Sequence, residues 1–132
     1  MSEERRPRVL VVDDEARVRG LLSDMLAIWG CQAVEAESSD TALALFDQGE
    51  YDLVLTDFLM PGRNGLELIR DVRSRDAGIG VIMFTASAAD FDADCRQLEF
   101  TVLRKPLQLE GLKSAVEQAL RGRTRTTPAA LS

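Results

Sequence analysis

The chain has 132 residues, of which 45% are hydrophobic and 29% charged, and its formal net charge is −6. These values are typical of one globular domain and disfavour a broad nucleic-acid-binding surface, because such surfaces are usually basic. No apolar run approaches the roughly 18 residues of a membrane span. The N-terminal "MSEERRPR" lacks the apolar core of a signal peptide, so we expect a cytoplasmic protein without a membrane anchor.

The chain contains two cysteines and no histidine. Cys31 and Cys95 do not form a CxxC pair, and we expect both to be reduced packing residues. Without histidine the chain has no imidazole base and cannot itself carry a phosphohistidine. Any bound metal must be held by oxygen atoms, which favours magnesium, manganese or calcium.

The first half of the chain alternates apolar strands with helical stripes. Residues 8–14 predict a buried strand, because Val9 to Val12 form a continuous apolar run. Residues 31–38 predict a weaker strand, and residues 39–49 a short helix. Between the two strands, the sequence predicts a helix that ends near Gly30. Its apolar residues follow helical spacing: Val18, Leu21, Leu22, Met25, Leu26 and Trp29.

The second half repeats this alternation. Buried strands are expected at residues 51–57 and 80–87, and a short strand at 101–106, where Pro106 stops it. Helices are expected at residues 65–76 and 88–99, and a last helix carries Leu109, Leu112, Val116 and Leu120 on one face.

Five strand–helix units predict an α/β fold. Strict alternation with continuous apolar strands is typical of a parallel sheet that helices cover on both faces. The domain is expected to span residues 8–121, after an N-terminal extension of residues 1–7. Residues 122–132 lose the apolar periodicity and are expected to form a flexible tail or linker stub.

Polar residues stand where the apolar strands end. Asp13 and Asp14 end the first strand, Asp57 the third, Thr85 the fourth and Lys105 the fifth. In open parallel sheets, ligands bind outside the carboxyl ends of the strands, so these side chains are expected to gather at one edge. Clustered carboxylates repel one another unless a cation binds, and magnesium suits such oxygen ligands. Lys105 and Thr85 would then suit an added anion such as a phosphoryl group.

In order and spacing, these motifs resemble the receiver domain of bacterial two-component response regulators, of the chemotaxis-receiver type. The resemblance covers about residues 7 to 121. It is carried by "VVDDE", "TDFLMPGRNG", "FTA" and "KP", which contain Asp13 and Asp14, Asp57, Thr85 and Lys105. The resemblance implies a flavodoxin-like (βα)5 doubly wound parallel sheet of strand order 2-1-3-4-5, in three α/β/α layers.

The resemblance implies a role for each matched residue. Asp57 would be the phosphoacceptor, and Thr85 and Lys105 would contact its phosphoryl oxygens. Asp13 and Asp14, with Asp57 and the main-chain carbonyl of Leu59, would hold Mg²⁺, for which Mn²⁺ can substitute. A turn beside the site would be shaped by Met60, Pro61, Gly62 and Gly65, and the peptide between Lys105 and Pro106 would be cis.

The implied function is a phosphorylation-activated switch in a two-component phosphorelay. A sensor histidine kinase or a histidine phosphotransfer protein would donate the phosphoryl group, and the domain would signal to an output domain or protein. A phosphorylation-dependent homodimer is compatible with this reading. The domain would not be an enzyme toward external substrates, because it would promote only its own phosphorylation and dephosphorylation.

Two alternatives remain open. A magnesium-dependent phosphohydrolase of the haloacid dehalogenase group also places an aspartyl nucleophile after a buried strand. Its usual D-x-D-x-T motif is absent, because Phe58 and Leu59 follow Asp57, and no insertion is available to form a cap. The second alternative is a degenerate receiver that binds partners without being phosphorylated, against which the intact acidic motifs argue.

The sequence departs from the family pattern near the last strand. The family usually has an aromatic residue three positions before the lysine, where this chain has Val102. Phe100 has the same strand parity but is not expected to replace it. The interval from Thr85 to Lys105, 20 residues, is short for the family, so the fourth helix is expected to be short or irregular.

Asp90, Asp92 and Asp94 form a D-x-D-x-D pattern that opens calcium-binding EF-hand loops. Such a loop also requires glycine at its sixth position and glutamate at its twelfth. Cys95 and Thr101 occupy these positions, so we interpret the three aspartates as part of a solvated helix.

Overall fold

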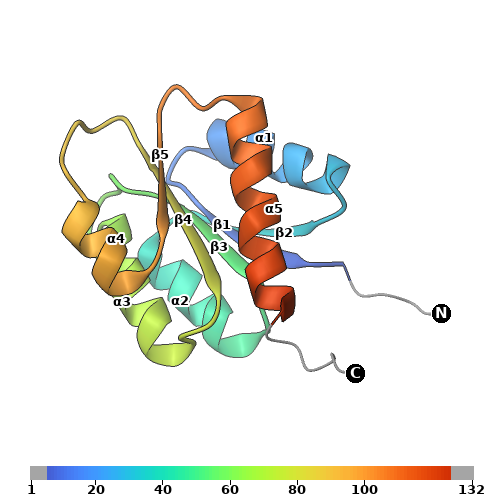
Figure 1. Cartoon of the computed structure of the whole chain (residues 1–132), viewed down its shortest axis with the longest axis horizontal. Coiled ribbons are helices and arrows are strands. Elements are labelled where there is room, and N and C mark those ends of the chain that lie inside the picture. The colour runs from blue at the N-terminus through green and yellow to red at the C-terminus, as the bar shows by residue number, and fades with distance from the viewer. Residues whose placement is uncertain (1–5, 126–132) are drawn as a thin grey trace.

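The computed structural model describes residues 6–125, which form a five-stranded parallel sheet between two layers of helices (Figure 1). The strand order is β2-β1-β3-β4-β5, which confirms the predicted flavodoxin-like topology. In chain order the elements are β1 (Arg8–Val12), α1 (Ala16–Ile28), β2 (Gln32–Ala36), α2 (Ser39–Gln48), β3 (Leu53–Asp57), α3 (Gly65–Arg75), β4 (Gly80–Thr85), α4 (Asp92–Leu98), β5 (Thr101–Arg104) and α5 (Leu109–Arg125).

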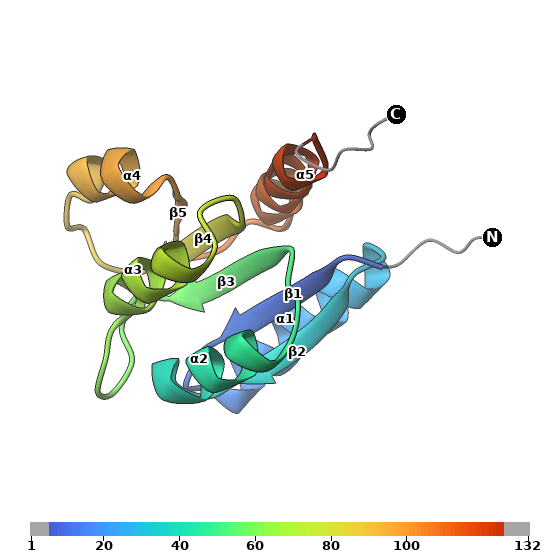
Figure 2. The same ribbon diagram turned by 90° about the horizontal axis from the view of Figure 1, so that it is seen from below.

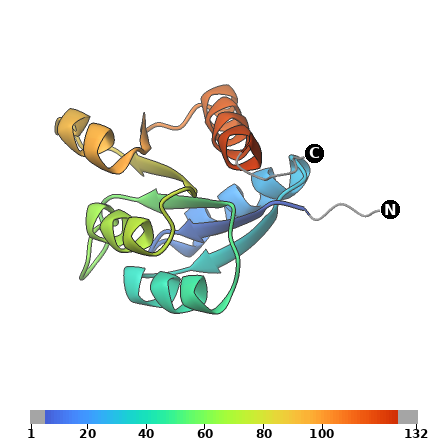
Figure 3. The same ribbon diagram turned by 60° about the horizontal axis from the view of Figure 1, so that its bottom comes forward.

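Each face of the sheet buries alternate side chains of the central strands. In β1, Val9 and Val11 pack with α1 and α5, whereas Leu10 and Val12 pack with α2 and α3. Figures 2 and 3 show the two helix pairs on opposite sides of the sheet. Because both faces are covered, the central strands are apolar throughout, as the continuous runs predicted.

The parallel register brings the carboxyl ends of the strands to one edge. Val12 of β1 lies opposite Thr56 of β3, and Asp57 lies opposite Phe84 of β4. Thr85 in turn lies opposite Arg104 of β5. The residues that follow these positions therefore meet at a single edge of the sheet.

Three local features differ from what the sequence patterns indicate. Leu21 shares the helical spacing of the apolar residues in α1 but is 60% exposed, because α5 and the sheet contact only part of that stripe. Leu109 is also 60% exposed, since it opens α5 at the rim of the domain. The α5 helix ends at Arg125, so it continues four residues into the segment predicted as a tail.

The region around α4 agrees with the expected irregularity. The α4 helix has 7 residues and begins only at Asp92, whereas a helix was expected from residue 88. Glu99 ends it with a left-handed backbone, at φ 58°. Val102 is half-buried against the core, Cys31 is buried, and Cys95 is half-buried, with both thiols free as predicted.

Within residues 6–125, no helix combines the length and the apolar character that crossing a membrane demands. The predicted N-terminal extension lies mostly outside the described residues, as do residues 126–132 of the predicted tail.

Candidate functional site

Three aspartates meet where β1 and β3 end. One carboxylate oxygen each from Asp13, Asp14 and Asp57 lies within 4.8 Å of the other two. Asp13 is fully buried, Asp57 is 6% exposed, and Asp14 faces solvent. The structure therefore brings together the three carboxylates that the sequence predicted as metal ligands, with one side open to water.

Asp13 is held from two directions but keeps one free oxygen. Its Oδ1 accepts a hydrogen bond from the main-chain N–H of Glu15 at 2.8 Å, and its main-chain oxygen accepts one from Arg19 of α1 at 2.8 Å. Among the described residues, no donor reaches its buried Oδ2. The pKa of Asp13 is raised to about 6, mainly by burial; the Glu15 hydrogen bond lowers it, and the nearby Asp57 charge raises it.

Asp57 faces the ammonium group of Lys105. The distance between Lys105 Nζ and Asp57 Oδ2 is 3.6 Å. Burial raises the pKa of Asp57, whereas Lys105 and the main-chain N–H groups of Phe58 and Leu59 lower it. The peptide between Lys105 and Pro106 is cis, as predicted.

Thr85 ends β4 at the same edge and is almost fully buried. Its Oγ1 accepts a hydrogen bond from the main-chain N–H of Ser87 at 2.9 Å, and its carbonyl accepts one from the Lys105 N–H at 2.8 Å. Thr85 thus connects the loop after β4 to the residue that carries the site's ammonium group.

The turn after Asp57 depends on two glycines. Gly62 adopts a left-handed backbone at φ 81°, which a residue with a side chain rarely adopts. Gly65 begins α3 directly against β3, so a Cβ there would collide with the main-chain oxygen of Asp57. The sequence predicted that both glycines shape this turn, and the structure gives each a steric reason.

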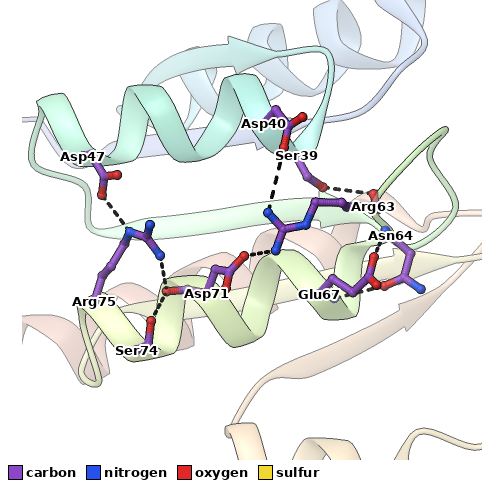
Figure 4. A network of polar contacts seen from close by, with 9 residues as sticks. All are labelled: Ser39, Asp40, Asp47, Arg63, Asn64, Glu67, Asp71, Ser74 and Arg75. Atoms are coloured by element: carbon purple, nitrogen blue, oxygen red, sulfur yellow. Dashed lines mark hydrogen bonds and ion pairs between the residues drawn. The ribbon is translucent and has the colours of Figure 1, made fainter.

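The same turn is anchored to α2 and α3 by polar contacts (Figure 4). The Arg63 guanidinium pairs with Asp71 of α3 and lies 3.8 Å from Asp40 of α2. The hydroxyl of Ser39 donates a hydrogen bond to the main-chain carbonyl of Arg63 at 3.1 Å. Next to it, the side chain of Asn64 caps α3 in a reciprocal capping box with its third residue. These contacts fix the segment that follows Asp57.

The arrangement fits a hard cation coordinated by oxygen atoms. The buried Oδ2 of Asp13 has no hydrogen bond, and its carboxylate neighbours are the ligands that magnesium prefers. A lysine lies on the other side of Asp57, where it suits an anion beside the cation. The donor set therefore fits Mg²⁺ together with a phosphoryl group.

The affinity for magnesium should depend on the protonation of Asp13. Below the folded pKa of about 6, the Asp13 carboxyl is protonated, and protons compete with the metal for its oxygen atoms. We expect excess MgCl₂ to raise the melting temperature at about pH 7.5 and to raise it much less at about pH 5. Thermal unfolding with and without the metal measures this difference.

The metal-free protein should show the opposite trend for this group. Between the unfolded pKa near 3.9 and the folded pKa of about 6, the folded state binds more protons, so Asp13 lowers stability as pH rises. Asp13→Asn should remove both effects. An equal magnesium-induced shift at both pH values in the wild-type protein would contradict the assignment.

Two arginines near the site were not predicted from the sequence. Arg19 reaches the main chain of Asp13 from α1, and Arg104 reaches the loop after Thr85 from β5. Arg104 directly precedes Lys105, and this adjacency was the only sequence signal for it. For Arg19, which is half-buried, we find no pattern in the sequence that distinguishes it from the other charged residues of the helix.

Comparison with known proteins identifies the family of this chain. A family model for the response regulator receiver domain matches residues 9–117. The chain is 40% identical over 90 residues to the transcriptional regulatory protein ResD of Bacillus subtilis, covering 68% of this chain and 37% of ResD. It is 30% identical over 115 residues to sporulation initiation phosphotransferase F of the same species, covering 86% of this chain and 93% of that protein.

A solved structure has the same fold. Response regulator protein TrrA from Thermotoga maritima, in complex with Mg²⁺ and BeF, superposes with a TM-score of 0.78 at 34% identity. The superposition covers 86% of this chain and 99% of that structure. With the strand order and the acidic edge, these matches show that the chain belongs to the family of response regulator receiver domains, the phosphorylation-activated modules of two-component signalling.

Proposed function

We propose that Asp57 accepts a phosphoryl group from a histidine kinase or a histidine phosphotransfer protein and that the domain then changes conformation. The observation that carries this proposal is the placement of Asp57 between two other carboxylates and the Lys105 ammonium, 3.6 Å away, at the open edge of the sheet. TrrA, a relative of the same fold, was solved in complex with Mg²⁺ and BeF, and this supports the proposal.

In the transfer, a carboxylate oxygen of Asp57 attacks the phosphorus, the bond from phosphorus to the donor's imidazole nitrogen breaks, and an acyl phosphate forms. Lys105 pairs with a phosphoryl oxygen, and the Thr85 hydroxyl donates a hydrogen bond to another. Asp13, Asp14, Asp57 and the Leu59 carbonyl would hold Mg²⁺. When bound, the metal neutralises the negative charge that this crowded site accumulates.

The proposed relay defines the partners by their chemistry. The phosphohistidine donor is a separate protein, because this chain has no histidine of its own. The receiver domain would comprise residues 8–121 and the last turn of α5, which ends at Arg125. Its phosphorylated conformation would be recognised by an output domain, by another protein or by a second copy of the chain. Within such a relay we place the domain in the cytoplasm, and its net charge of −6 disfavours direct contact with nucleic acid.

A small phosphodonor tests the proposal without any partner. Acetyl phosphate or phosphoramidate with MgCl₂ should add one phosphoryl group to the intact protein, as measured by mass spectrometry. Chelation of magnesium with EDTA should suppress the addition. A protein that keeps its fold and binds magnesium but gains no mass would instead be a receiver that acts without phosphorylation.

The lifetime of the phosphorylated state should depend on Leu59. This side chain is 62% exposed beside Asp57 and offers no hydrogen bond to a water molecule that attacks the acyl phosphate. We expect Leu59→Asn to shorten the half-life several-fold, because an amide can orient that water. The decay of phosphorylated protein after removal of the donor measures it.

Leu59→Met is the matched control, because it keeps an apolar side chain of similar volume. Its half-life should stay close to that of the wild-type protein. Equal half-lives for the asparagine variant and the wild type would show that Leu59 does not shield the site.

A further inference from the structure

Arg104 connects the phosphoacceptor edge to the loop that leads into α4. It is the last residue of β5, pairs in register with Thr85 and directly precedes Lys105. The main-chain N–H of Lys105 also donates to the Thr85 carbonyl. The backbone of Arg104 is therefore fixed beside the residue that is proposed to contact the phosphoryl group.

The guanidinium of Arg104 spans the loop of residues 86–91, between β4 and α4. Its Nη1 donates a hydrogen bond to the carbonyl of Ser87 at 2.5 Å, and its Nη2 donates one to the carbonyl of Ala89 at 2.9 Å. The guanidinium thus binds two carbonyls of one loop at once through its rigid planar fork, a geometry that a lysine ammonium does not have.

The far end of this loop is tied to the residue after the phosphoacceptor. The guanidinium carbon of Arg104 lies 5.4 Å from the centre of the Phe91 ring, a cation–π distance. Phe91 is buried and packs edge-to-face against Phe58, with ring centres 5.0 Å apart. Phe58 directly follows Asp57. Arg104 therefore contacts a loop whose two ends are both attached to the site.

A movement of Thr85 would have to disturb these contacts. The Thr85 hydroxyl oxygen accepts the Ser87 N–H, and the Ser87 carbonyl is the group that Arg104 holds. A Thr85 side chain that turns toward a phosphoryl oxygen must therefore either lose its bond to Ser87 or carry Ser87 away from the guanidinium.

We propose that Arg104 is a positioning residue that holds loop 86–91 in its resting position and opposes the phosphorylated conformation. This inference rests on the proposed phosphorylation of Asp57. The Arg104 contacts link the loop to β5 in a chain that has Val102 where the family usually has an aromatic residue. An interaction made only in the resting state lowers the population of the other state, so its removal shifts the equilibrium toward activation.

Two measurements on the whole chain test the inference. Titration of beryllofluoride with excess magnesium, followed through backbone amide signals, gives the affinity for the phosphoryl mimic. We expect Arg104→Gln to bind it about fivefold tighter or more, in the usual range of coupling between sites. Hydrogen exchange of residues 86–91 without the mimic should become faster in the same variant.

Two further variants control the experiment. Arg104→Lys keeps the charge but loses the bidentate fork, so its affinity should fall between those of wild type and Arg104→Gln. It also carries the test if a melting curve shows that Arg104→Gln does not fold. Arg96→Gln removes the same charge from the exposed surface of α4 and should leave both readouts at wild-type values.

The outcomes separate the two proposals. If the wild-type protein does not bind beryllofluoride, the proposed phosphorylation of Asp57 is wrong, and the role of Arg104 falls with it. If the wild type binds but Arg104→Gln matches it in affinity and loop exchange, only the role of Arg104 is wrong. Weaker binding by Arg104→Gln would overturn the inference too, because Arg104 would then support the active state.

Discussion

Asp57→Asn is expected to abolish the magnesium-dependent phosphorylation of the domain by acetyl phosphate. The amide is a poor nucleophile and brings no negative charge to the metal ligands that surround it. Lys105, 3.6 Å from the aspartate oxygen in the wild type, would lose its ionic partner, because the amide oxygen of asparagine carries no negative charge. Intact mass after incubation with the donor should show no added phosphoryl group.

Asp24→Asn is the matched control, because it makes the same chemical change on the exposed surface of α1. This variant should gain one phosphoryl group at the wild-type rate. If Asp57→Asn is labelled as fast as the wild type, another residue is the acceptor and the proposed chemistry is wrong.

Gly65→Ala is expected to destabilise the domain and disturb the site together. A Cβ at this position would collide with the main-chain oxygen of Asp57 and lie 3.0 Å from the Cα of Phe58. Because both are backbone atoms, no side-chain rotation relieves the clash. We expect a loss of about 3 kcal/mol in the free energy of unfolding, at the upper end of overpacking effects, together with weaker magnesium binding.

Gly20→Ala provides the contrast within the same chain. Gly20 lies inside α1, and apart from its chain neighbours and the adjacent backbone of the helix an added Cβ would meet no heavy atom within 4 Å. Alanine in a helix interior is favoured over glycine by about 0.5–1 kcal/mol, so this variant should be more stable than the wild type. Urea unfolding of both variants measures the two signs. A Gly65→Ala protein as stable as the wild type would show that α3 can move away from β3 without loss.

Apolar periodicity predicted the fold because every central strand is covered on both faces. Continuous runs such as Val9 to Val12 have few other structures to adopt, and short connections then restrict the strand order. Prediction was weaker at the rim of the domain. Leu21 has the spacing of a core residue, but spacing alone does not reveal how far a neighbouring helix extends over it.

The sequence was sufficient to predict which residues meet at the site. It was not sufficient to predict how their burial and pKa values differ. Asp13 and Asp14 are adjacent and chemically identical, yet one is fully buried and the other faces water. Only the three-dimensional path of β1 into α1 decides this, and with it the raised pKa of Asp13. Arg104 was missed for a similar reason, because its partners are main-chain carbonyls 17 and 15 residues away, which carry no sequence signal.

The most direct test of the central claim identifies the residue that carries the phosphoryl group. Borohydride reduces an acyl phosphate of aspartate to homoserine, which peptide mass spectrometry locates in the sequence. After treatment with acetyl phosphate and magnesium, we predict homoserine at Asp57, at the end of β3. Homoserine at another position, or none in a protein that has gained the phosphoryl mass, would contradict the assignment of Asp57 as the phosphoacceptor.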